Sequence, residues 1–553
     1  MTHLHRLLLC TALLLHAASP SAQPLPQGRF RNPLESDIGL SATFAEFRTN
    51  HFHAGIDMRT GGTEGHAVHA ADDGYVARVS ISPWGGGKIL YIKHEGGYTS
   101  VYMHLRSYAG AIGQAVTREQ YAQKSYSISK TFAEGELPVK KGQVVAYSGN
   151  TGGSGGPHLH FELRTGGEAD LHTHATTINP LLFGLPYRDG IKPTLRGVRV
   201  YPVGGEPYSL GADGIIRADR PFYLGIYSTD AAEGSTPNNG PDHVEVFLDG
   251  TPFFTYTTET IPLDSTRMVN ALIDWAHFSN TRQPYLLTRG LPGAAGPWVP
   301  TRMGDGIFRL KPGSTHSIGI RVSDIAGNTA ERVITVHMAS LATQTVAQRS
   351  APDAYNRPYI FDNGAMRVDM EPMTLYADDS MRCQSAGGAF TVEPTVNNIP
   401  PHKSYTLCLR GSLPDVPAEK TVVASVSRKQ GNRKLTAYKT THADGMHTAQ
   451  VREWGEFTLA ADTTAPTVRP INFAEGRKLK TTTLKVGIAD NLAGIESYSC
   501  TLNGQWILAE YDGKTATLVI NAAGKLEAGA NKLRVVVTDG TGNCTDRTWS
   551  ISK

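Results

Sequence analysis

The amino-acid sequence predicts an all-β protein in which an antiparallel β-sheet domain is followed by immunoglobulin-like β-sandwich domains. Three observations support this fold class. Glycine accounts for 58 of the 553 residues and recurs in pairs and triplets that are typical of turns. Runs rich in Thr, Val and Tyr lie between these turns, and such residues favour strands. Helical periodicity is nearly absent, and the length allows roughly three to four domains.

Residues 1–22 have the features of a secretory signal peptide. Arg6 precedes the apolar run Leu7 to Leu15, and small residues follow as far as Ala22, where we expect cleavage. Cys10 has too little apolar sequence before it for a good lipid-attachment site. No later segment is long and apolar enough to span a bilayer. We therefore expect a soluble, exported protein without a transmembrane segment, either periplasmic or secreted.

The charge balance and the cysteines narrow the classes of function. Lys and Arg number 53 against 50 Asp and Glu, and no basic cluster stands out, so we expect no nucleic-acid partner. Without the signal peptide, four cysteines remain, an even number in an oxidising compartment. We expect Cys383 to pair with Cys408 and Cys500 with Cys544, because each pair lies within one proposed domain. Zinc binding by these four is disfavoured, since no Cys-x-x-Cys occurs.

Residues 23–190 are the first expected domain. Its strand-like runs alternate with glycine turns and are Val68 to Val79, Lys88 to His94, Thr99 to Leu105, Gly142 to Ser148 and His158 to Leu163. A polar insertion lies between Arg106 and Pro138, with a short helix expected at Thr117 to Lys124. This insertion is either a loop at the rim of a cleft or decoration, and the sequence favours neither.

The remainder of the chain contains an internal repeat. Val322-Ser323-Asp324-Ile325-Ala326-Gly327-Asn328 corresponds to Val537-Thr538-Asp539-Gly540-Thr541-Gly542-Asn543, and the strand-like runs upstream of each correspond as well. Two copies of one immunoglobulin-like β-sandwich, at residues 191–340 and 463–553, are the economical explanation. A third region, residues 345–462, lies between them, and its strand-like runs favour an all-β class.

Residues 152–163 consist of a glycine-rich loop followed by a run in which polar and apolar residues alternate. Successive side chains of a strand point to opposite faces. One face therefore carries His158, His160 and Glu162, while the other face carries three apolar residues that point toward a core: Leu159, Phe161 and Leu163. Two imidazoles on one face indicate a site, and Glu162 either orients one of them or is solvated at an edge.

His53 and Asp57 form a second motif, in which Gly55 allows a tight turn. A His and an Asp with a His from a second strand are sound zinc ligands, and three such ligands leave a fourth position for water, as in catalytic sites. His104 and His158 would flank this water, one accepting its proton and the other stabilising the oxyanion or protonating the leaving amine. The combination predicts metal-assisted hydrolysis of an amide.

Residues 45–165 resemble the lysostaphin/LytM-type zinc metallopeptidases. The resemblance is carried by five motifs: His53-x-x-x-Asp57, Tyr102-Met103-His104-Leu105, Gly142-Gln143-Val144, Ser148-Gly149-Asn150-Thr151-Gly152 and Gly156-Pro157-His158-Leu159-His160-Phe161-Glu162-Leu163. It implies one Zn2+ in the catalytic domain, held by His53, Asp57 and His160, with His104 and His158 as the catalytic pair. It also implies an antiparallel sheet with a narrow groove, and a substrate in peptidoglycan cross-bridges or stem peptides.

We therefore expect an exported zinc metalloendopeptidase that hydrolyses peptide bonds of bacterial peptidoglycan. The alternative is a non-enzymatic wall-binding scaffold or an activator of other wall hydrolases, which the presence of all three ligands and both catalytic histidines disfavours. A protease of ordinary proteins stays open, because the same groups cleave either kind of amide. The C-terminal domains are candidates for binding wall glycan or a protein partner.

Several features stay open within this prediction. His51 could replace His53 as a ligand, but the three-residue spacing to Asp57 belongs to His53. The insertion at 106–138 is longer than in the minimal family domain, so the width of the groove is not defined by the resemblance. Residues 23–45 could cover the groove and inhibit the enzyme.

Overall fold

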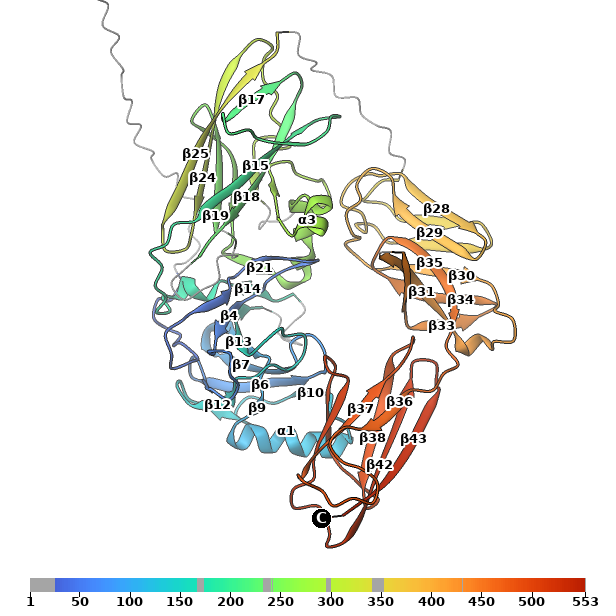
Figure 1. Cartoon of the computed structure of the whole chain (residues 1–553). Coiled ribbons are helices and arrows are strands. Elements are labelled where there is room, and N and C mark those ends of the chain that lie inside the picture. Colours follow the sequence, from blue (N-terminus) through green and yellow to red (C-terminus); the bar gives the residue numbers. More distant parts are fainter. Residues whose placement is uncertain are drawn as a thin grey trace, which may run out of the picture.

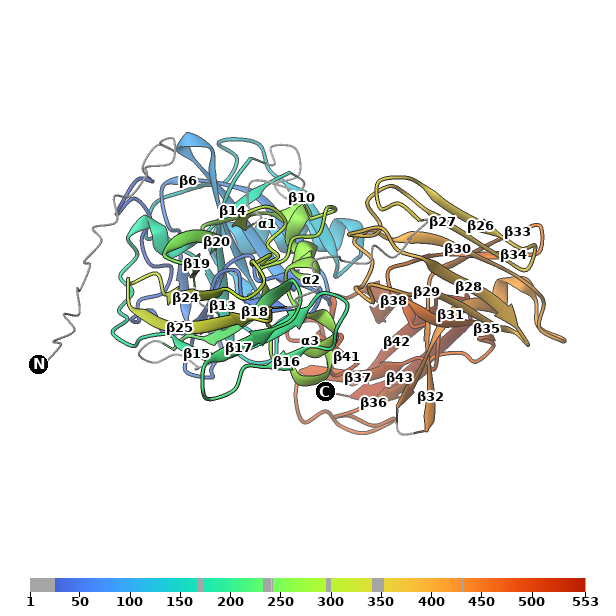
Figure 2. The same ribbon diagram turned by 90° about the horizontal axis from the view of Figure 1, so that it is seen from above.

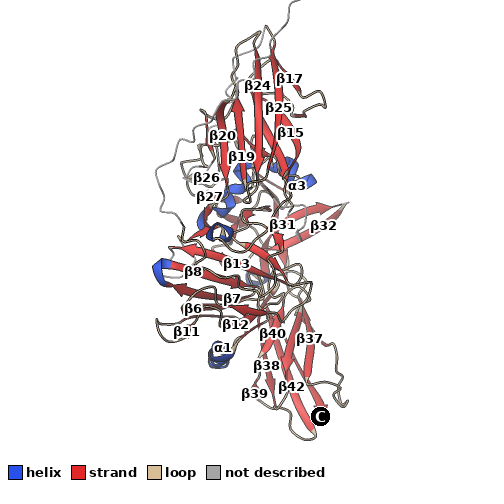
Figure 3. Cartoon of the chain, turned by 90° about the vertical axis from the view of Figure 1, so that its left-hand side faces the viewer, coloured by secondary structure: helices blue, strands red, loops and turns tan. Residues whose placement is uncertain are grey.

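The computed structural model describes residues 25–166, 174–231, 240, 242–294, 300–340, 353–429 and 431–552. Strands dominate this part of the chain, and helices are few (Figure 3). The sequence prediction is thus confirmed at the level of a mostly β protein that contains several separate sheets. The predicted signal peptide, residues 1–22, lies outside the described residues. None of the described helices is long and apolar enough to cross a membrane.

The first unit is built on one large antiparallel sheet. Its central path runs β1 (Leu40–Ala42), β4 (Ile56–Arg59), β13 (His158–Thr165), β8 (Tyr98–Met103), β7 (Lys88–His94), β6 (Gly74–Ile81) and β10 (Ile128–Thr131). Strands β11 (Pro138–Val139) and β14 (Thr176–Ile178) extend it. A smaller sheet joins β5 (Ala67–His69), β12 (Val144–Tyr147) and β9 (Ser107–Tyr108), and a hairpin joins β2 (Phe47–Arg48) and β3 (His51–Phe52).

Strand β13 lies near the middle of this sheet, between β4 and β8. The alternation predicted for it is confirmed, because Leu159, Phe161 and Leu163 are fully buried in the main hydrophobic core. Every second side chain must then point to the opposite face. The pleat of this one strand therefore delivers His158, His160 and Glu162 to a common face of the sheet.

The single strand predicted at Val68 to Val79 is wrong. The chain breaks after His69 into the turn at residues 70–73, and the two pieces, β5 and β6, belong to different sheets. Gly74 opens the second piece, where a Cβ would lie only 2.2 Å from the carbonyl oxygen of Lys93. The apolar runs on either side of the turn resemble one strand in the sequence because both are buried.

The insertion between Arg106 and Pro138 contains more helix than predicted. Helix α1 spans Gly110–Gln123 and ends at Lys124, whose backbone is left-handed. It begins seven residues before the predicted start at Thr117, since the glycines at positions 110 and 113 have a low helix propensity. The helix packs against the sheet through Ile112 and Val116.

The second unit contains two sheets. One has the order β16 (Tyr208–Ser209), β15 (Thr194–Pro202), β18 (Phe222–Thr229) and β22 (Leu286–Leu287). The other has the order β17 (Ile215–Ala218), β25 (Thr329–Met338), β24 (Thr315–Ser323), β19 (His243–Leu248), β20 (Thr251–Thr257) and β23 (Thr301–Arg302). Helices α2 (Val269–Leu272) and α3 (Trp275–Thr281) precede β22 in the chain. Strand β21 (Thr260–Pro262) pairs with β14 of the first unit.

The last two units are also pairs of sheets. Residues 353–461 form two sheets. The strand order of one is β26 (Tyr359–Asp362), β27 (Met366–Met370), β30 (Tyr405–Arg410), β34 (Met446–Val451) and β33 (Thr440–Ala443). The strand order of the other is β28 (Met381–Ala386), β29 (Ala389–Pro394), β35 (Gly455–Ala461), β31 (Thr421–Lys429) and β32 (Asn432–Ala437). The C-terminal unit also forms two sheets. The strand order of one is β36 (Thr467–Pro470), β37 (Thr483–Ala489), β41 (Thr517–Asn521) and β40 (Ala509–Asp512). The strand order of the other is β39 (Gln505–Trp506), β38 (Ile495–Leu502), β42 (Ala530–Asp539) and β43 (Cys544–Ser552).

Short 3-10 helices complete the described chain, at η1 (Glu95–Gly97), η2 (Pro180–Phe183), η3 (Leu263–Met268) and η4 (Ala418–Lys420). The paired sheets agree with β-sandwiches, and the immunoglobulin-like class and the domain boundaries remain predictions. Figures 1 and 2 show the order of the units in space. The chain passes from the first unit to the second, then to the third, and the C-terminal unit returns to lie beside the first near α1 and β10.

The two predicted disulfides are wrong, because all four described cysteines are free. Cys500 on β38 and Cys544 on β43 lie on opposite sides of β42. Two strand spacings separate them by roughly 10 Å, beyond the Cα distance of a disulfide. Cys383 and Cys408 lie on different sheets, and only Cys383 packs against the core, while Cys408 alternates with the buried Leu407 and Leu409. Shared domain membership was too weak a criterion for pairing.

Candidate metal centre

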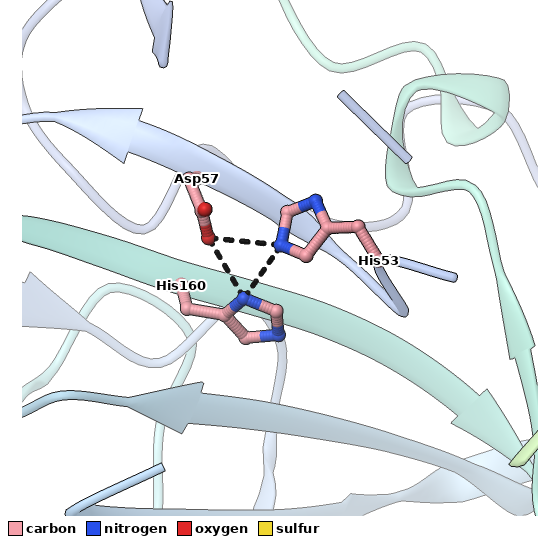
Figure 4. A group of neighbouring side chains, drawn as sticks. All are labelled: His53, Asp57 and His160. Carbon is pink, nitrogen blue, oxygen red and sulfur yellow. Dashed lines mark hydrogen bonds and ion pairs between the residues drawn. The ribbon is translucent and has the colours of Figure 1, made fainter. Parts of the chain in front are cut away.

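Three side chains from two neighbouring strands and the turn before them converge on one point. His53 Nε2 lies 3.0 Å from Asp57 Oδ1 and 2.9 Å from His160 Nδ1, and the last two atoms are 2.8 Å apart (Figure 4). All three residues are buried. They are the three ligands expected from the sequence, and they form one of the groups of His, Cys, Asp and Glu in the described chain that could hold a metal ion.

The register of the sheet brings these residues together. Strands β4 and β13 pair antiparallel with His160 directly opposite Asp57. His53 precedes β4 and reaches the same point across the turn at Gly55. A Cβ on Gly55 would lie 2.4 Å from Phe161 O and 2.9 Å from His160 Nε2, so only glycine allows the turn to lie this close to β13.

Each ligand uses its other polar atom in a separate hydrogen bond. His53 Nδ1 donates to the carbonyl oxygen of Thr43 at 2.7 Å, and His160 Nε2 donates to Glu162 Oε1 at 2.8 Å. Arg48 Nη2 donates to Asp57 Oδ2 at 2.8 Å. The three converging atoms are therefore the ones left available for a cation, and the hydrogen bonds hold each imidazole in the matching tautomer.

The donor set fits zinc. Zinc binds imidazole nitrogen and carboxylate oxygen at about 2.0–2.2 Å, which places ligands of a tetrahedral site about 3.3 Å apart. The three observed separations are slightly shorter than this value. A small outward movement of each side chain would accommodate the ion. Two nitrogens and one oxygen leave one tetrahedral position open, which is typical of catalytic rather than structural sites.

The electrostatics of the group also favour a cation. Burial lowers the pKa of His53 to about 4, so its imidazole is neutral. Burial alone would lower the pKa of His160 as well, but hydrogen bonds to Asp57 and Glu162, and the charges of both, raise it to about 9. Burial would raise the pKa of Asp57, but the surrounding histidines hold it well below its usual range. The site thus attracts positive charge, which a metal ion would supply in place of a proton.

Glu162 is held in turn by Arg164. Arg164 Nε donates to Glu162 Oε2 at 2.5 Å, and both side chains are about 2 % exposed. The sequence left two interpretations of Glu162, as a residue that orients a ligand or as a solvated edge carboxylate. In the structure Glu162 is buried and orients His160. Arg164 could have been found from the same alternation, because it is two positions further along β13. Arg48 could not, because its position depends on the β2–β3 hairpin.

His104 and His158 lie next to each other beside the three converging side chains. Their ring centroids are 4.8 Å apart, and His104 lies 6.0 Å from the His160 ring. His104 follows β8 with a left-handed backbone, φ 60°, which turns its side chain toward the site. Its Nδ1 donates to Thr151 O, and His158 Nδ1 donates to Gly156 O, each at 2.8 Å.

Both of these imidazoles therefore keep Nε2 available. His158 Nε2 lies 3.5 Å from Asp57 Oδ1, so it faces the metal-ligand group. Burial lowers the pKa of His104 to about 3, with help from the charge of His160. Ser154 shapes the loop before β13, because its Oγ donates to Gly156 O at 2.8 Å and lies 3.2 Å from His158 Nδ1.

The other histidines that the structure describes in the first unit do not join this group. His51 is exposed and its Nδ1 lies 3.1 Å from Thr49 O, so the expectation that His53 and not His51 faces Asp57 agrees with the geometry. His66 contacts Thr63, His69 contacts Pro33, and His94 contacts Ser100. His172 lies outside the described residues.

The C-terminal unit contacts the loop that precedes β13, which the sequence did not indicate. Lys514 Nζ donates to the carbonyl oxygens of Asn150 and Ser154. Nearby, Trp84 meets Tyr511 edge-to-face, and Tyr121 of α1 meets Trp506 in the same way. A cavity of about 370 Å3 lies between the two units. The loop that leads into His158 is thus supported from outside its own domain.

A buried His, Asp and His donor set beside two further imidazoles is the arrangement of a metal-dependent hydrolase site. Residues 51–130 and 121–171 match the model of peptidase family M23. The chain therefore contains a domain of the M23 peptidase family, similar to the catalytic domain of lysostaphin.

Three curated relatives illustrate this similarity. An uncharacterized metalloprotease of Haemophilus influenzae is 31% identical over 170 residues, 30% of this chain and 29% of its own. The peptidoglycan DD-endopeptidase ShyA of Vibrio cholerae is 29% identical over 139 residues, 24% of this chain and 26% of its own. Lysostaphin of Staphylococcus simulans is 31% identical over 111 residues, 20% of this chain and 17% of its own. The similarity spans less than a third of each relative.

Proposed function

We propose that the protein is a zinc metalloendopeptidase that hydrolyses peptide bonds of bacterial peptidoglycan, in a cross-bridge or a stem peptide. The observation that carries the proposal is the convergence of His53 Nε2, Asp57 Oδ1 and His160 Nδ1 within 3.0 Å of one another beside His104 and His158. The names of related proteins, a peptidoglycan DD-endopeptidase and lysostaphin, support the substrate class.

His53, Asp57 and His160 would hold one Zn2+. Bound there, zinc would act as a Lewis acid on a carbonyl oxygen and lower the pKa of a water molecule. His158 is placed to accept a proton through Nε2, since its Nδ1 is occupied by Gly156 O. His104, with its Nδ1 donating to Thr151 O, faces the same space and would donate to the developing oxyanion or to the leaving amine.

The setting of the enzyme follows from its substrate. Residues 1–22 resemble a secretory signal peptide, and peptidoglycan lies outside the cytoplasmic membrane, so we propose that the protein is periplasmic or secreted. The units after the peptidase domain would bring it to wall glycan or to a protein partner. A scaffold without activity is the weaker alternative, because each of the three donor atoms is still present and oriented.

The test is digestion of purified cross-linked peptidoglycan by the mature protein, with the released muropeptides identified by mass. We expect loss of cross-linked species, sensitivity to a chelator and recovery on zinc addition. Casein in a parallel reaction distinguishes a general protease, which would cleave it at a comparable rate.

Four variants and one control separate the roles. His160→Ala and Asp57→Ala should lose zinc and activity together, whereas His104→Ala and His158→Ala should keep stoichiometric zinc and lose activity by at least ~100-fold. His51→Ala, an exposed neighbour, should behave like the wild type. Full activity of zinc-free His160→Ala would refute the proposal, and zinc-loaded protein without activity would favour the scaffold.

A further inference from the structure

Two further groups of three aspartates lie outside the candidate zinc site. In the second unit the members are Asp189, Asp230 and Asp324, and in the C-terminal unit they are Asp462, Asp490 and Asp539. Within each group, one carboxylate oxygen per residue lies within 4.8 Å of the others. Neither group takes any part in the proposed hydrolysis.

The two groups occupy equivalent positions of the internal repeat. Asp189 and Asp462 each begin the pattern Asp-x-x-x-Pro-Thr that leads into the first strand of its unit, β15 or β36. Asp230 and Asp490 each follow directly on the next long strand, β18 or β37. The third aspartate in each group begins the pattern Asp-x-x-Gly-Asn before the last strand, β25 or β43.

Hydrogen bonds reproduce the same geometry twice. Asn328 Nδ2 donates to Asp324 Oδ2 at 2.8 Å and to the carbonyl oxygen of Asp189 at 3.1 Å. Asn543 Nδ2 donates to Asp539 Oδ2 at 2.8 Å and to the carbonyl oxygen of Asp462 at 3.0 Å. In both units the asparagine fixes the entering segment against the Asp-x-x-Gly-Asn loop, which holds the carboxylates close together.

One oxygen in each group has no protein partner. Asp230 is 4 % exposed, and its Oδ1 is buried without a hydrogen bond. The equivalent atom of the other unit, Asp490 Oδ1, is buried and unpartnered in the same way. A buried carboxylate oxygen without a partner is costly, and two such atoms at matching positions indicate a ligand that is common to both.

Among the described residues, Asp230, Asp324, Asp490 and Asp539 form no ion pair with Lys or Arg. The groups thus concentrate negative charge at sites that exclude water. A bound cation would relieve this repulsion.

We propose that each aspartate group binds one Ca2+ ion, so that the protein carries two calcium sites in addition to its zinc site. Ca2+ takes six to eight oxygen ligands at about 2.3–2.6 Å, and two oxygens on one ion are then at most about 5 Å apart. The observed limit of 4.8 Å satisfies this condition. The donors are carboxylates only, which suits a hard cation rather than zinc.

The position of the sites defines their effect on the molecule. Asp189 belongs to the segment between η2 and β15, and Asp462 to the segment between β35 and β36, so each comes from the stretch that enters the unit. The other two ligands of each site belong to the unit itself. Calcium would therefore clamp the entering segment to the body of the unit and stiffen the junction with the unit before it.

The test is a calcium titration of the mature full-length chain, kept saturated with zinc so that the peptidase site is occupied. We expect two Ca2+ per chain by equilibrium dialysis. Asp230→Asn and Asp490→Asn should each retain one, and the double variant should retain none. Asp213→Asn and Asp546→Asn, exposed aspartates of the same two units, are matched controls and should retain two. No binding at millimolar calcium, or unchanged stoichiometry in the double variant, would overturn the proposal.

Thermal unfolding distinguishes a metal ligand from a residue that merely supports the fold. Without calcium, Asp230→Asn removes a buried charge and should unfold at the same or a higher temperature than the wild type. With calcium, the wild type should gain stability and the variant should gain only the share of its remaining site. Asp189→Asn, outside the strands, repeats this comparison at the same site. A variant that is destabilised equally with and without calcium would indicate a structural role instead.

Discussion

Lys88 Nζ lies 2.7 Å from Glu510 Oε2, which joins two residues 422 positions apart in the chain. The Lys88 side chain is 8 % exposed, and the same Nζ donates to the carbonyl oxygen of Arg106 at 2.9 Å. This pair links β7 of the peptidase sheet with β40 of the C-terminal unit. Together with Lys514, it holds the last unit of the chain against the domain that carries the candidate active site.

A double-mutant cycle should detect this link. We expect Lys88→Met and Glu510→Gln to show a coupling of about 1 kcal/mol in the free energy of unfolding, because Lys88 is largely buried. The pair Lys439 and Glu496, also between units but exposed at 84 % and 56 %, is the matched control and should show almost none. Equal coupling in both pairs would contradict the importance of burial.

Removal of Glu162 should weaken zinc binding without removing a ligand. Glu162 accepts from His160 Nε2 and orients the ring, and loss of such outer partners typically costs 10–100-fold in metal affinity. We expect Glu162→Ala to fall in this range and Glu162→Gln, which keeps an acceptor oxygen, to lose less. Competition with a chromophoric chelator measures the affinity, and Glu119→Gln on α1 serves as the control. Identical affinities in all variants would show that His160 needs no support.

Gly55→Ala should damage both the fold and the site. Its Cβ would lie 2.4 Å from Phe161 O, so the turn must move away from β13, at a cost of roughly 1–3 kcal/mol in stability. His160, 2.9 Å from the same Cβ, should bind zinc less tightly. Gly319→Ala is the control, because its Cβ would meet Phe247 at an ordinary 3.7 Å. Denaturant unfolding and zinc affinity are the measurements, and wild-type values for Gly55→Ala would disprove the close approach.

His402 should make the protein less stable in mild acid. Burial, with the charges of Arg452, Lys403 and Arg267, lowers its pKa from 6.5 to about 4. Between these values the unfolded chain binds a proton that the folded protein excludes, so this contribution to stability is complete above about pH 6.5 and is lost as the pH falls toward 4. His402→Gln should therefore show a smaller drop in unfolding temperature between pH 7.5 and pH 5 than the wild type. The exposed His337→Gln should show the wild-type drop, and an unchanged drop in His402→Gln would contradict the assignment.

Local patterns in the sequence predicted the parts of the site that depend on local geometry. The alternation of β13 placed His158, His160 and Glu162 on one face, because a strand leaves no other choice. The glycine at position 55 indicated the close turn that brings His53 to them. These positions follow from the pleat and from backbone sterics alone.

Contacts between distant segments were outside the reach of the sequence. Arg48 reaches Asp57 only because β2 and β3 form a hairpin, and Lys514 reaches Asn150 only because the C-terminal unit turns back. The predicted cysteine pairs were wrong for the same reason, since membership of one domain does not specify which strands are neighbours. The aspartates at 230 and 490 carried no recognisable signal until the fold placed them beside their partners.

The return of the C-terminal unit to the peptidase domain also imposes an order in time. The peptidase domain precedes the C-terminal unit in the chain, so in an exported protein it crosses the membrane earlier and can fold before the C-terminal unit arrives. During that interval the carbonyl groups of Asn150 and Ser154 face water rather than Lys514, and the loop before His158 lacks its outer support. The supporting contact forms only after the C-terminal unit has folded against the peptidase domain, so this loop differs in rigidity before and after that step.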